Sequence, residues 1–516
     1  MKLLATIFLC ISGFIPFAEA QTSFYENLPV GKHPVGFKVV TIDDPTRVEP
    51  MYNYIGEKNT GKPERQVTIH LWYPAKASGN TKKMSYEDYI VSQLLTDSKK
   101  PVSDDQRAIQ SRSRRSSTEN WFGKTADENW NKLLSTSMLA VPNAGAPKEK
   151  FPVLIGTLRP LSTTVVNELL ASHGFIVAMV VQGNFQLSSS NQVMLRTIPD
   201  LQTALKYVCD HEQGDVERVG SFGFSGSGFA QVLLAMFDPR IKAVADIESG
   251  FYMNDLYQFQ KSSDYYQTDL LRVPFLHIFS ADLSKEEKYL SDFTVRKKFS
   301  KRYRLILTQP KLHHWDFAAE GYAATLLLNN RGDAQNAIRQ SFEISATYLV
   351  SFFNAELQDN EAGKTFMLSK PTIAGKDPSL WAITTYDALK PAPNAVELEN
   401  LIDKRGIDEA LRTLSTTLPN DSLSTLRDGF ALNSLGYKYL GSKKHKEALS
   451  LFDTNVTLHP DNANFNDSLA EALEKQGDFD RMKVVAQHVL DLLSKKATLS
   501  PSEQAVKRAN EKRVQH

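Results

Sequence analysis

Short, uninterrupted apolar runs alternate with amphipathic stretches from about Val35 to Phe353. Such runs are typical of parallel strands buried on both faces, and the amphipathic stretches between them are typical of crossover helices. The expected strands are Gln66–Tyr73, Phe151–Thr157, Phe175–Val181, Val219–Phe224, Ile241–Ile247, Val273–Phe279 and Tyr303–Leu307, and the expected helices are Thr164–Ser172, Ile198–Asp210 and Phe229–Phe237. The pattern predicts an α/β fold with a doubly wound, mostly parallel sheet.

A polar segment, Thr96–Glu128, interrupts this pattern after the first expected strand. It is rich in Ser, Arg, Lys and Asp and has no periodic apolar face of useful length. Its basic cluster of Arg112, Arg114 and Arg115 is more typical of a solvated face than of an anion site. We expect an insertion over about residues 96–135, which is either a cap over an active site or a surface insertion.

The composition changes after a proline-spaced segment that carries Pro371, Pro378, Pro391 and Pro393. From Asn394 onward the pattern is helical, with self-similarity at 34 residues. The repeated positions include Leu435, Gly436, Tyr439, Ala448, Phe452 and Pro460, then Leu469 and the turn Gly477-Asp478, with a weaker unit around Gly406–Leu414. The region resembles tetratricopeptide repeats, and a generic bundle of helical hairpins is the alternative. The expected order is an α/β domain at 21–385, all-α helical repeats at 394–495 and a polar tail at 496–516.

The composition is that of an ordinary globular protein, and its 516 residues exceed what one core usually accommodates. The 60 basic and 59 acidic residues leave a formal net charge of +1. This balance gives no electrostatic reason to expect nucleic acid or an anionic membrane as a partner.

The N-terminus has the pattern of a signal peptide over residues 1–20. Lys2 precedes the apolar stretch Leu3–Phe17, and Ala18-Glu19-Ala20 provides a cleavage site with small residues. The stretch is shorter than the ~20 residues of a spanning helix, so we expect export to the periplasm or the medium with no stable membrane span. Cleavage would leave Cys209 alone, without a partner for an intramolecular disulfide.

The segment Gly223-Phe224-Ser225-Gly226-Ser227-Gly228 lies between an expected strand and an expected helix. A nucleophile elbow requires this context, because the serine occupies a tight turn whose neighbours must be small. Gly223 meets that need, and Ser227 stands where the pattern usually has glycine. Ser225 is the candidate nucleophile, with Ser227 and a purely structural glycine-rich turn as alternatives.

A serine hydroxyl needs a base and an orienting acid. His313 and His314 follow the last expected strand of the hydrolase region, which is where the chain order serine, acid, histidine places the base. A surface pair is one alternative for these histidines. A metal site with Asp316 is the other, but the sequence offers no helical pair of histidines to support it, and we expect neither a metal nor an organic cofactor.

Residues 35–350 resemble the platelet-activating-factor acetylhydrolase and dienelactone hydrolase branch of the α/β-hydrolases. The resemblance is carried by Phe151–Leu154, Ala171–Ala178, Gly223–Gly228, Val273–Leu276 and His314–Phe317. It implies cleavage of an ester by acyl transfer to serine and then to water, without a cofactor. It also implies Ser225 as the nucleophile and Gly226 as an oxyanion donor. His314 matches the family's base better than His313, because Phe317 follows it at the family's spacing.

The resemblance leaves the acid and the second oxyanion donor less well defined. Glu248 lies at the acetylhydrolase position, where relatives usually have Asp, and Asp282 lies at the dienelactone-type position. Asp246 falls inside a strand, which favours a structural role. The backbone N–H of Arg159, beside Pro160, falls where the family places the second oxyanion donor, although the family's motif is altered here.

Two classes of function follow from this pattern. The first is an exported serine hydrolase that acts on a small-molecule or polymer ester, with helical repeats that bind a protein partner. The second is an inactive hydrolase fold that serves as an interaction platform, which the altered oxyanion loop favours. A serine peptidase uses the same catalytic residues and is a third reading.

Overall fold

The computed structural model describes residues 24–48, 64–77, 81–95, 102–158, 162–181, 190–249, 263–282, 298–327, 332–369, 371–387 and 390–515. The expected signal peptide at 1–20 and the expected oxyanion donor Arg159 lie outside these ranges.

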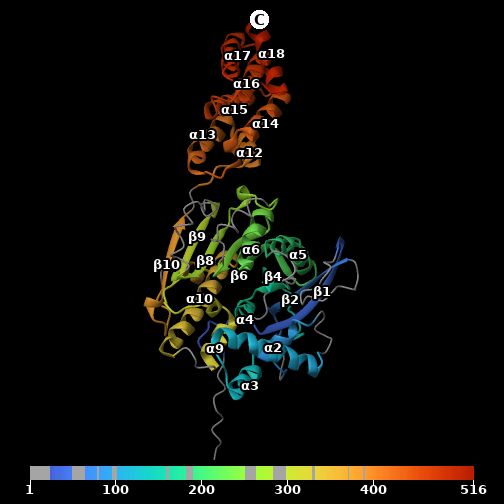
Figure 1. The fold of residues 1–516 in the computed structure, drawn as a ribbon, viewed down its shortest axis with the longest axis vertical. Helices are drawn as coiled ribbons and strands as arrows, with labels where there is room; N and C mark the ends of the chain where they lie inside the picture. The colour runs from blue at the N-terminus through green and yellow to red at the C-terminus, as the bar shows by residue number, and fades with distance from the viewer. Residues whose placement is uncertain are drawn as a thin grey trace, which may run out of the picture.

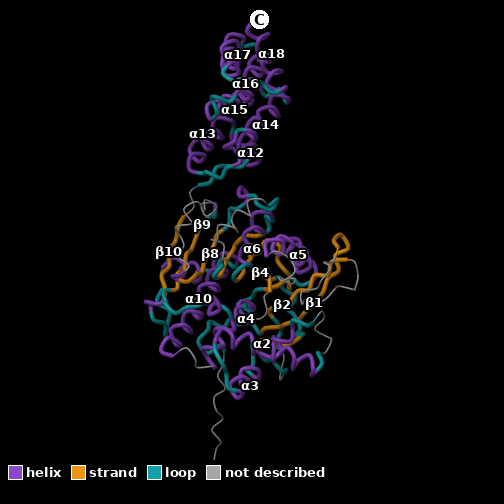
Figure 2. Tube along the Cα trace, viewed as in Figure 1, coloured by secondary structure: helices purple, strands orange, loops and turns teal. Residues whose placement is uncertain are grey.

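A mostly parallel sheet runs through the larger, N-terminal domain (Figures 1 and 2). Its strands are β1 (Val35–Val48), β2 (Glu64–Pro74), β3 (Ala140–Pro142), β4 (Phe151–Leu158), β5 (Ile176–Val181), β6 (Gly214–Phe224), β7 (Ile241–Ile247), β8 (Pro274–Ser280), β9 (Lys301–Leu307) and β10 (Trp381–Asp387). In the described part of the chain the order is β10-β9-β8-β7-β6-β4-β5-β2-β1-β3. Strands β4 to β9 run parallel to one another, whereas β2 pairs antiparallel with β5 and with β1, and β10 pairs antiparallel with β9. This order confirms the doubly wound α/β prediction and is the topology of the α/β-hydrolase fold.

Helices cover both faces of the sheet and divide the hydrophobic core in two. Helices α5 (Ser190–His211) and α6 (Ser227–Phe237) pack on one face, where Ile155, Leu201 and Leu234 are buried together. Helices α4 (Thr164–Ser172), α9 (Ala319–Leu327) and α10 (Gln335–Leu357) cover the other face, with α11 (Glu361–Ser369) packed on α10. Covering both faces explains why the parallel strands read as continuous apolar runs.

Helix α1 (Tyr86–Ser92) precedes the polar insertion. The described part of the insertion contains two helices, α2 (Asp104–Phe122) and α3 (Asp127–Ser135). The side chain of Ser103 accepts a hydrogen bond from the backbone N–H of Gln106, and the Gln106 side chain accepts from the backbone N–H of Ser103. This reciprocal cap starts α2. Along α2 only Ser111, Thr118 and Phe122 are buried. A helix that buries so few side chains needs no apolar stripe, which is why the sequence pattern did not predict it.

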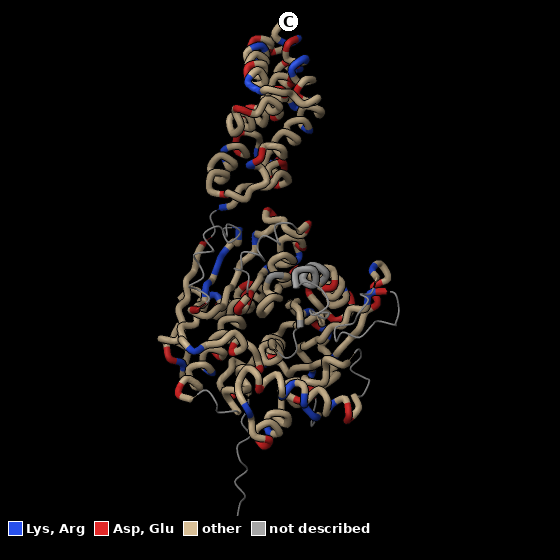
Figure 3. The backbone as a smooth tube through the Cα atoms, viewed as in Figure 1, with Lys and Arg blue, Asp and Glu red and all other residues tan. Residues whose placement is uncertain are grey.

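Helices that pack on their sequence neighbours form the C-terminal domain (Figure 1). They are α12 (Ala395–Arg405), α13 (Ile407–Thr417), α14 (Phe430–Gly441), α15 (His445–Leu458), α16 (Ala463–Gln476), α17 (Phe479–Ser494) and α18 (Pro501–Gln515). The all-α prediction is therefore confirmed for this region. The segment 496–516, set apart by its composition as a polar tail, instead contributes α18, because Asn510 and Arg513 are buried against Asp467 of α16. Basic and acidic residues are interspersed along the backbone of this domain (Figure 3).

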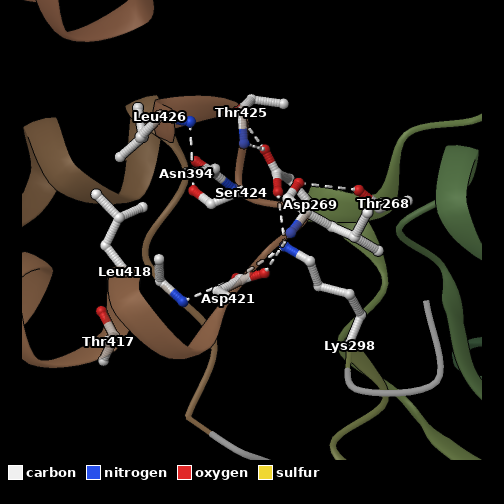
Figure 4. A network of polar contacts seen from close by, with 12 residues as sticks. Thr268, Asp269, Lys298, Asn394, Thr417, Leu418, Asp421, Ser424, Thr425 and Leu426 are labelled. Atoms are coloured by element: carbon white, nitrogen blue, oxygen red, sulfur yellow. Dashed lines mark hydrogen bonds and ion pairs between the residues drawn. The ribbon is translucent and has the colours of Figure 1, made fainter. Parts of the chain in front are cut away.

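A buried ionic cluster joins the two domains (Figure 4). Lys298, which precedes β9, contacts Asp269 of the hydrolase domain at 3.0 Å and Asp421 of the helical domain at 2.8 Å. All three side chains are buried. Thr425 donates its hydroxyl to Asp269, and the backbone N–H of Ala392 donates to Asp421 at 3.0 Å. Since Asp269 precedes β8 and Lys298 precedes β9, the helical domain docks at the amino-terminal edge of the sheet.

No helix within the described ranges combines the length and apolar character needed to cross a bilayer.

Candidate active site

Ser225 occupies the tight turn between β6 and α6. Its φ of 57° lies in the left-handed region, which non-glycine residues seldom adopt. Its backbone N–H donates to the Ile247 carbonyl at 2.9 Å, and its own carbonyl accepts from the Gly228 N–H at 3.0 Å. Such a backbone costs on the order of 1–3 kcal/mol and persists where the surrounding structure enforces it, commonly at functional sites. The half-buried Ser225 side chain is therefore presented at the carboxyl edge of the sheet by a strained strand–turn–helix.

Close packing around the turn explains its small residues. A Cβ on Gly223 would lie 2.7 Å from both the carbonyl carbon and the Oγ of Ser227, and one on Gly228 would lie 2.7 Å from the Cβ of Ser249. Ser227 is buried and donates its hydroxyl to the Phe224 carbonyl at 2.8 Å. Its hydroxyl therefore stabilises the turn, and of the two serines Ser225 is the one placed at the surface of the turn.

The loop after β9 brings His314 to the residue that precedes the serine. The His314 ring stacks on the Phe224 ring, with centroids 4.8 Å apart and planes at 25°. The short 3-10 helix η5 (His314–Phe317) holds this position, because Asp316 accepts the His313 backbone N–H at 2.7 Å while Phe317 is buried in the core. His313 is exposed, whereas His314 is half-buried against the turn. The arrangement favours His314 as the base.

Glu248 is a buried carboxylate at the carboxyl end of β7. Its φ is 45°, and its backbone N–H donates to the Ile278 carbonyl at 2.7 Å. Both carboxylate oxygens are held by Ser280 at the end of β8: one accepts the backbone N–H at 2.8 Å and the other the hydroxyl at 2.9 Å. Desolvation raises the pKa of Glu248 to about 7, and the Ser280 hydrogen bonds oppose this rise. Glu248 and Ser225 thus lie at the ends of adjacent strands.

The other two carboxylates considered from the sequence lie in different settings. Asp282 is exposed just after β8, close enough to Glu248 to contribute to its raised pKa. Asp246 is fully buried within β7 and accepts hydrogen bonds from the Ser249 hydroxyl and from the His277 ring on β8. These hydrogen bonds connect Asp246 to β8 and to the segment that follows β7.

Gly226 is the N-cap residue of α6, which begins at Ser227, and has φ −56° and ψ −22°. Its backbone N–H belongs to the first turn of α6, where N–H groups have no partner within the helix and the helix dipole favours negative charge. This is the position of an oxyanion donor in the elbow geometry. The second expected donor, Arg159, lies outside the described residues.

The metal alternative has no support in the described ranges, where no group of three or more His, Cys, Asp and Glu side chains is arranged to hold an ion. In particular, Asp316 caps the histidine loop through the His313 backbone.

The structure also adds residues that the sequence did not single out. Ser280 binds Glu248 through both its backbone and its hydroxyl. Trp315 lies 5.8 Å from Phe224 and 5.6 Å from His314 between ring centroids, and Trp121 of α2 lies 5.5 Å from Trp315. Ser280 could have been considered from the sequence, because it lies two positions before the candidate acid Asp282. Nothing in the sequence indicated that Trp121 contacts Trp315.

Replacing Glu248 by glutamine is expected to weaken the pH dependence of stability. Folding raises the pKa of this carboxyl from 4.5 to about 7, so the unfolded chain loses the proton at a lower pH than the folded protein. The free energy of unfolding therefore falls as pH increases from 4.5 to 7. The shift corresponds to about 3 kcal/mol. In urea denaturation at pH 4.5 and pH 8, the wild type should lose more unfolding free energy between the two pH values than Glu248→Gln, by up to this amount. Glu217→Gln, at an exposed site on β6, should match the wild type. Equal losses in the wild type and Glu248→Gln would contradict this.

Comparison with solved structures gives fold-level likenesses, one of which is described here. No family model matches the chain, and no curated protein matches it. A solved structure of a ferulic acid esterase from Streptomyces cinnamoneus superposes over 71% of this chain and 100% of that chain, with a TM-score of 0.49 and 17% identity. A likeness of this degree assigns neither residues nor a substrate.

Proposed function

We propose that the chain is a serine hydrolase that cleaves a carboxylic ester, with Ser225 as nucleophile and His314 as base. The observation that carries the proposal is the left-handed Ser225 in the turn between β6 and α6, because this conformation projects the hydroxyl beyond the sheet edge. His314 stacked on Phe224 and the carboxylates at the ends of β7 and β8 support it further. The proposal rests on these residues and not on the structural likeness.

The first half of the proposed reaction forms an acyl-enzyme. His314 takes the Ser225 proton as Oγ attacks the ester carbonyl, and the Gly226 N–H donates to the oxyanion that develops. The oxyanion collapses, the bond to the alcohol oxygen breaks, and His314 returns the proton to the leaving alcohol. Glu248 or Asp282 stabilises the imidazolium that forms between these steps.

The second half releases the acid. His314 takes a proton from water, and the resulting hydroxide attacks the acyl carbonyl. The oxyanion then collapses, the bond to Ser225 Oγ breaks, and His314 returns the proton to that oxygen. The chemistry requires a proton acceptor and oxyanion donors, which side chains and backbone groups can provide without a redox cofactor.

Kinetics with p-nitrophenyl acetate test the assignment of base and acid. His314→Ala is expected to lower kcat/KM by at least about 10³-fold because the hydroxyl loses its proton acceptor. His313→Ala is the matched control. Its kcat/KM should remain within about threefold of the wild-type value, because the His313 side chain is exposed. The reverse ranking would transfer the role of base to His313.

The acid is decided by Glu248→Gln against Asp282→Asn, each of which removes charge while keeping size. The variant that removes the acid should lose about 10²- to 10⁴-fold in kcat, and the other should lose less than about tenfold. Unfolding curves of both variants separate an effect on catalysis from an effect on folding. An active wild type with neither variant impaired would remove the acid from the proposal and leave a serine–histidine pair.

An inactive interaction platform and a serine peptidase remain the competing functions. Wild-type protein that hydrolyses no ester in a panel of acyl lengths and no peptide would favour the platform. Hydrolysis of peptides at a higher kcat/KM than esters would favour the peptidase. The position of the helical domain is compatible with partner binding by an active enzyme, because it docks at the edge of the sheet opposite the candidate site.

A further inference from the structure

Aromatic rings extend from the candidate nucleophile to the insertion. The Phe224 ring, next to Ser225, lies 5.8 Å from the Trp315 ring, and Trp315 lies 5.5 Å from Trp121 at the end of α2. The two tryptophan planes meet at 49°. These residues come from three segments: β6, the loop after β9 and the insertion. Folding therefore brings three aromatic rings into a row, here called the aromatic wall, in which Phe224 is buried and the accessible face belongs to Trp121 and part of Trp315.

Trp121 is not needed to attach its helix to the rest of the domain. The neighbouring Phe122 is buried in the core, and Thr118 and Ser111 of the same helix are also buried. Arg114 lies 3.5 Å from the buried Glu320 carboxylate on α9 and adds a second attachment. Trp121 itself remains 61% exposed. Its indole, which lies beside Trp315, is therefore available to contact a ligand.

The helix that carries Trp121 is fixed against the same elements that hold the candidate base. Helix α9, which receives Arg114, directly follows η5, and α2 packs on α9. The aromatic wall is therefore held in place beside His314 and is not a chance contact of a loop. Its rings present flat apolar surface and few hydrogen-bonding groups, so the chemistry that fits it is an extended apolar or aromatic group.

We propose that the aromatic wall binds an extended apolar or aromatic acyl group of the ester, with Trp121 as a specificity-determining residue contributed by the insertion. This inference rests on the proposed function, since it places the acyl group next to Ser225. It also defines a role for the insertion: α2 forms one side of the acyl site. An acetyl group is too short to extend from Ser225 along Trp315 to Trp121, whereas a naphthoyl or long aliphatic group extends further along the wall.

The test compares p-nitrophenyl acetate with p-nitrophenyl 2-naphthoate. Trp121→Ala is expected to lower kcat/KM for the naphthoate about tenfold, mainly through KM, and to leave the acetate within about threefold. Trp121→Phe should recover most of the loss because it restores an aromatic face. Ile109→Ala is the matched control, since Ile109 is 55% exposed on the same helix and should affect neither ester. Equal losses on both esters, or no loss on either, would overturn the proposal.

Direct binding separates this inference from the proposed function. Methyl 2-naphthoate is titrated into Ser225→Ala and into Ser225→Ala/Trp121→Ala, and calorimetry measures Kd. About tenfold weaker binding to the double variant supports the wall even if the wild type hydrolyses no ester, in which case only the proposed function fails. Equal Kd values overturn the wall even if the wild type is an active esterase.

Discussion

Ser225→Ala is expected to lower kcat/KM for ester hydrolysis by at least about 10⁴-fold, because no other group at the turn can accept the acyl chain. Ser227→Ala is the matched control two positions along the chain. It removes a hydrogen bond to the Phe224 carbonyl and should reduce activity by less than about tenfold. Initial rates at several substrate concentrations measure both effects.

The fold should survive the Ser225 change. The Ser225 hydroxyl is half-buried at the surface of the turn, so alanine at this position should alter the unfolding free energy by less than about 1 kcal/mol. A stable Ser225→Ala variant with wild-type activity would remove Ser225 from the mechanism. A wild-type rate retained by Ser225→Ala but lost in Ser227→Ala would assign the nucleophile to Ser227.

Lys298→Met is expected to have the largest effect on stability, a loss of about 3–5 kcal/mol, because it leaves two buried carboxylates without their cation. Lys298 is only 1% exposed, and its ammonium group contacts both Asp269 and Asp421 (Figure 4). Because the contact crosses the domain boundary, the variant should also expose the segment 390–393 that leads into the helical domain. Urea denaturation measures the loss, and limited proteolysis measures the exposure of this segment.

Two comparisons distinguish this cluster from an ordinary ion pair. Lys446→Met breaks an exposed pair with Asp408 and should cost less than about 1 kcal/mol. The triple variant Lys298→Met/Asp269→Asn/Asp421→Asn removes the unpaired charges and should regain part of the stability lost in Lys298→Met. A loss in Lys298→Met no greater than that in Lys446→Met would contradict the role of the cluster in joining the domains.

The apolar pattern identified the central sheet because parallel strands are buried on both faces. Strand Ile241–Ile247 and helix Thr164–Ser172 were expected with the bounds that the structure gives them. Strand β6 begins earlier than expected, at Gly214, because the polar start of the strand pairs with Phe151 and Pro152 at the edge of the core. These first residues of β6 belong to the strand because of their pairing with β4, and an apolar pattern cannot report that pairing.

Elements without a clear apolar period were harder to predict. Helix α2 was not predicted, because few of its side chains are buried and its sequence has no apolar stripe. The local feature that marks its start is the Ser103 cap. Strand β10 lies among prolines at the edge of the sheet, where only the pairing with β9 identifies it. It reaches Asp387, so the sheet continues past residue 385, where the hydrolase domain was expected to end.

The candidate site shows the same division between local and non-local information. Ser225 could be found in the sequence because its turn is a local motif. The contact of His314 with Phe224 joins residues far apart in the chain, and only their order relative to the strands hinted at it. The partner of Glu248 and the approach of Trp121 to Trp315 depend on tertiary packing, which no local pattern reports.

Labelling with a fluorophosphonate is the most direct test of the central claim, because the reagent phosphonylates a serine only where a base activates it. The wild type should form one adduct, and mass spectrometry of the digested protein should locate it on Ser225. Ser225→Ala and His314→Ala should both remain unlabelled while folded. An adduct on another residue, or a folded wild type that never reacts, would contradict the account.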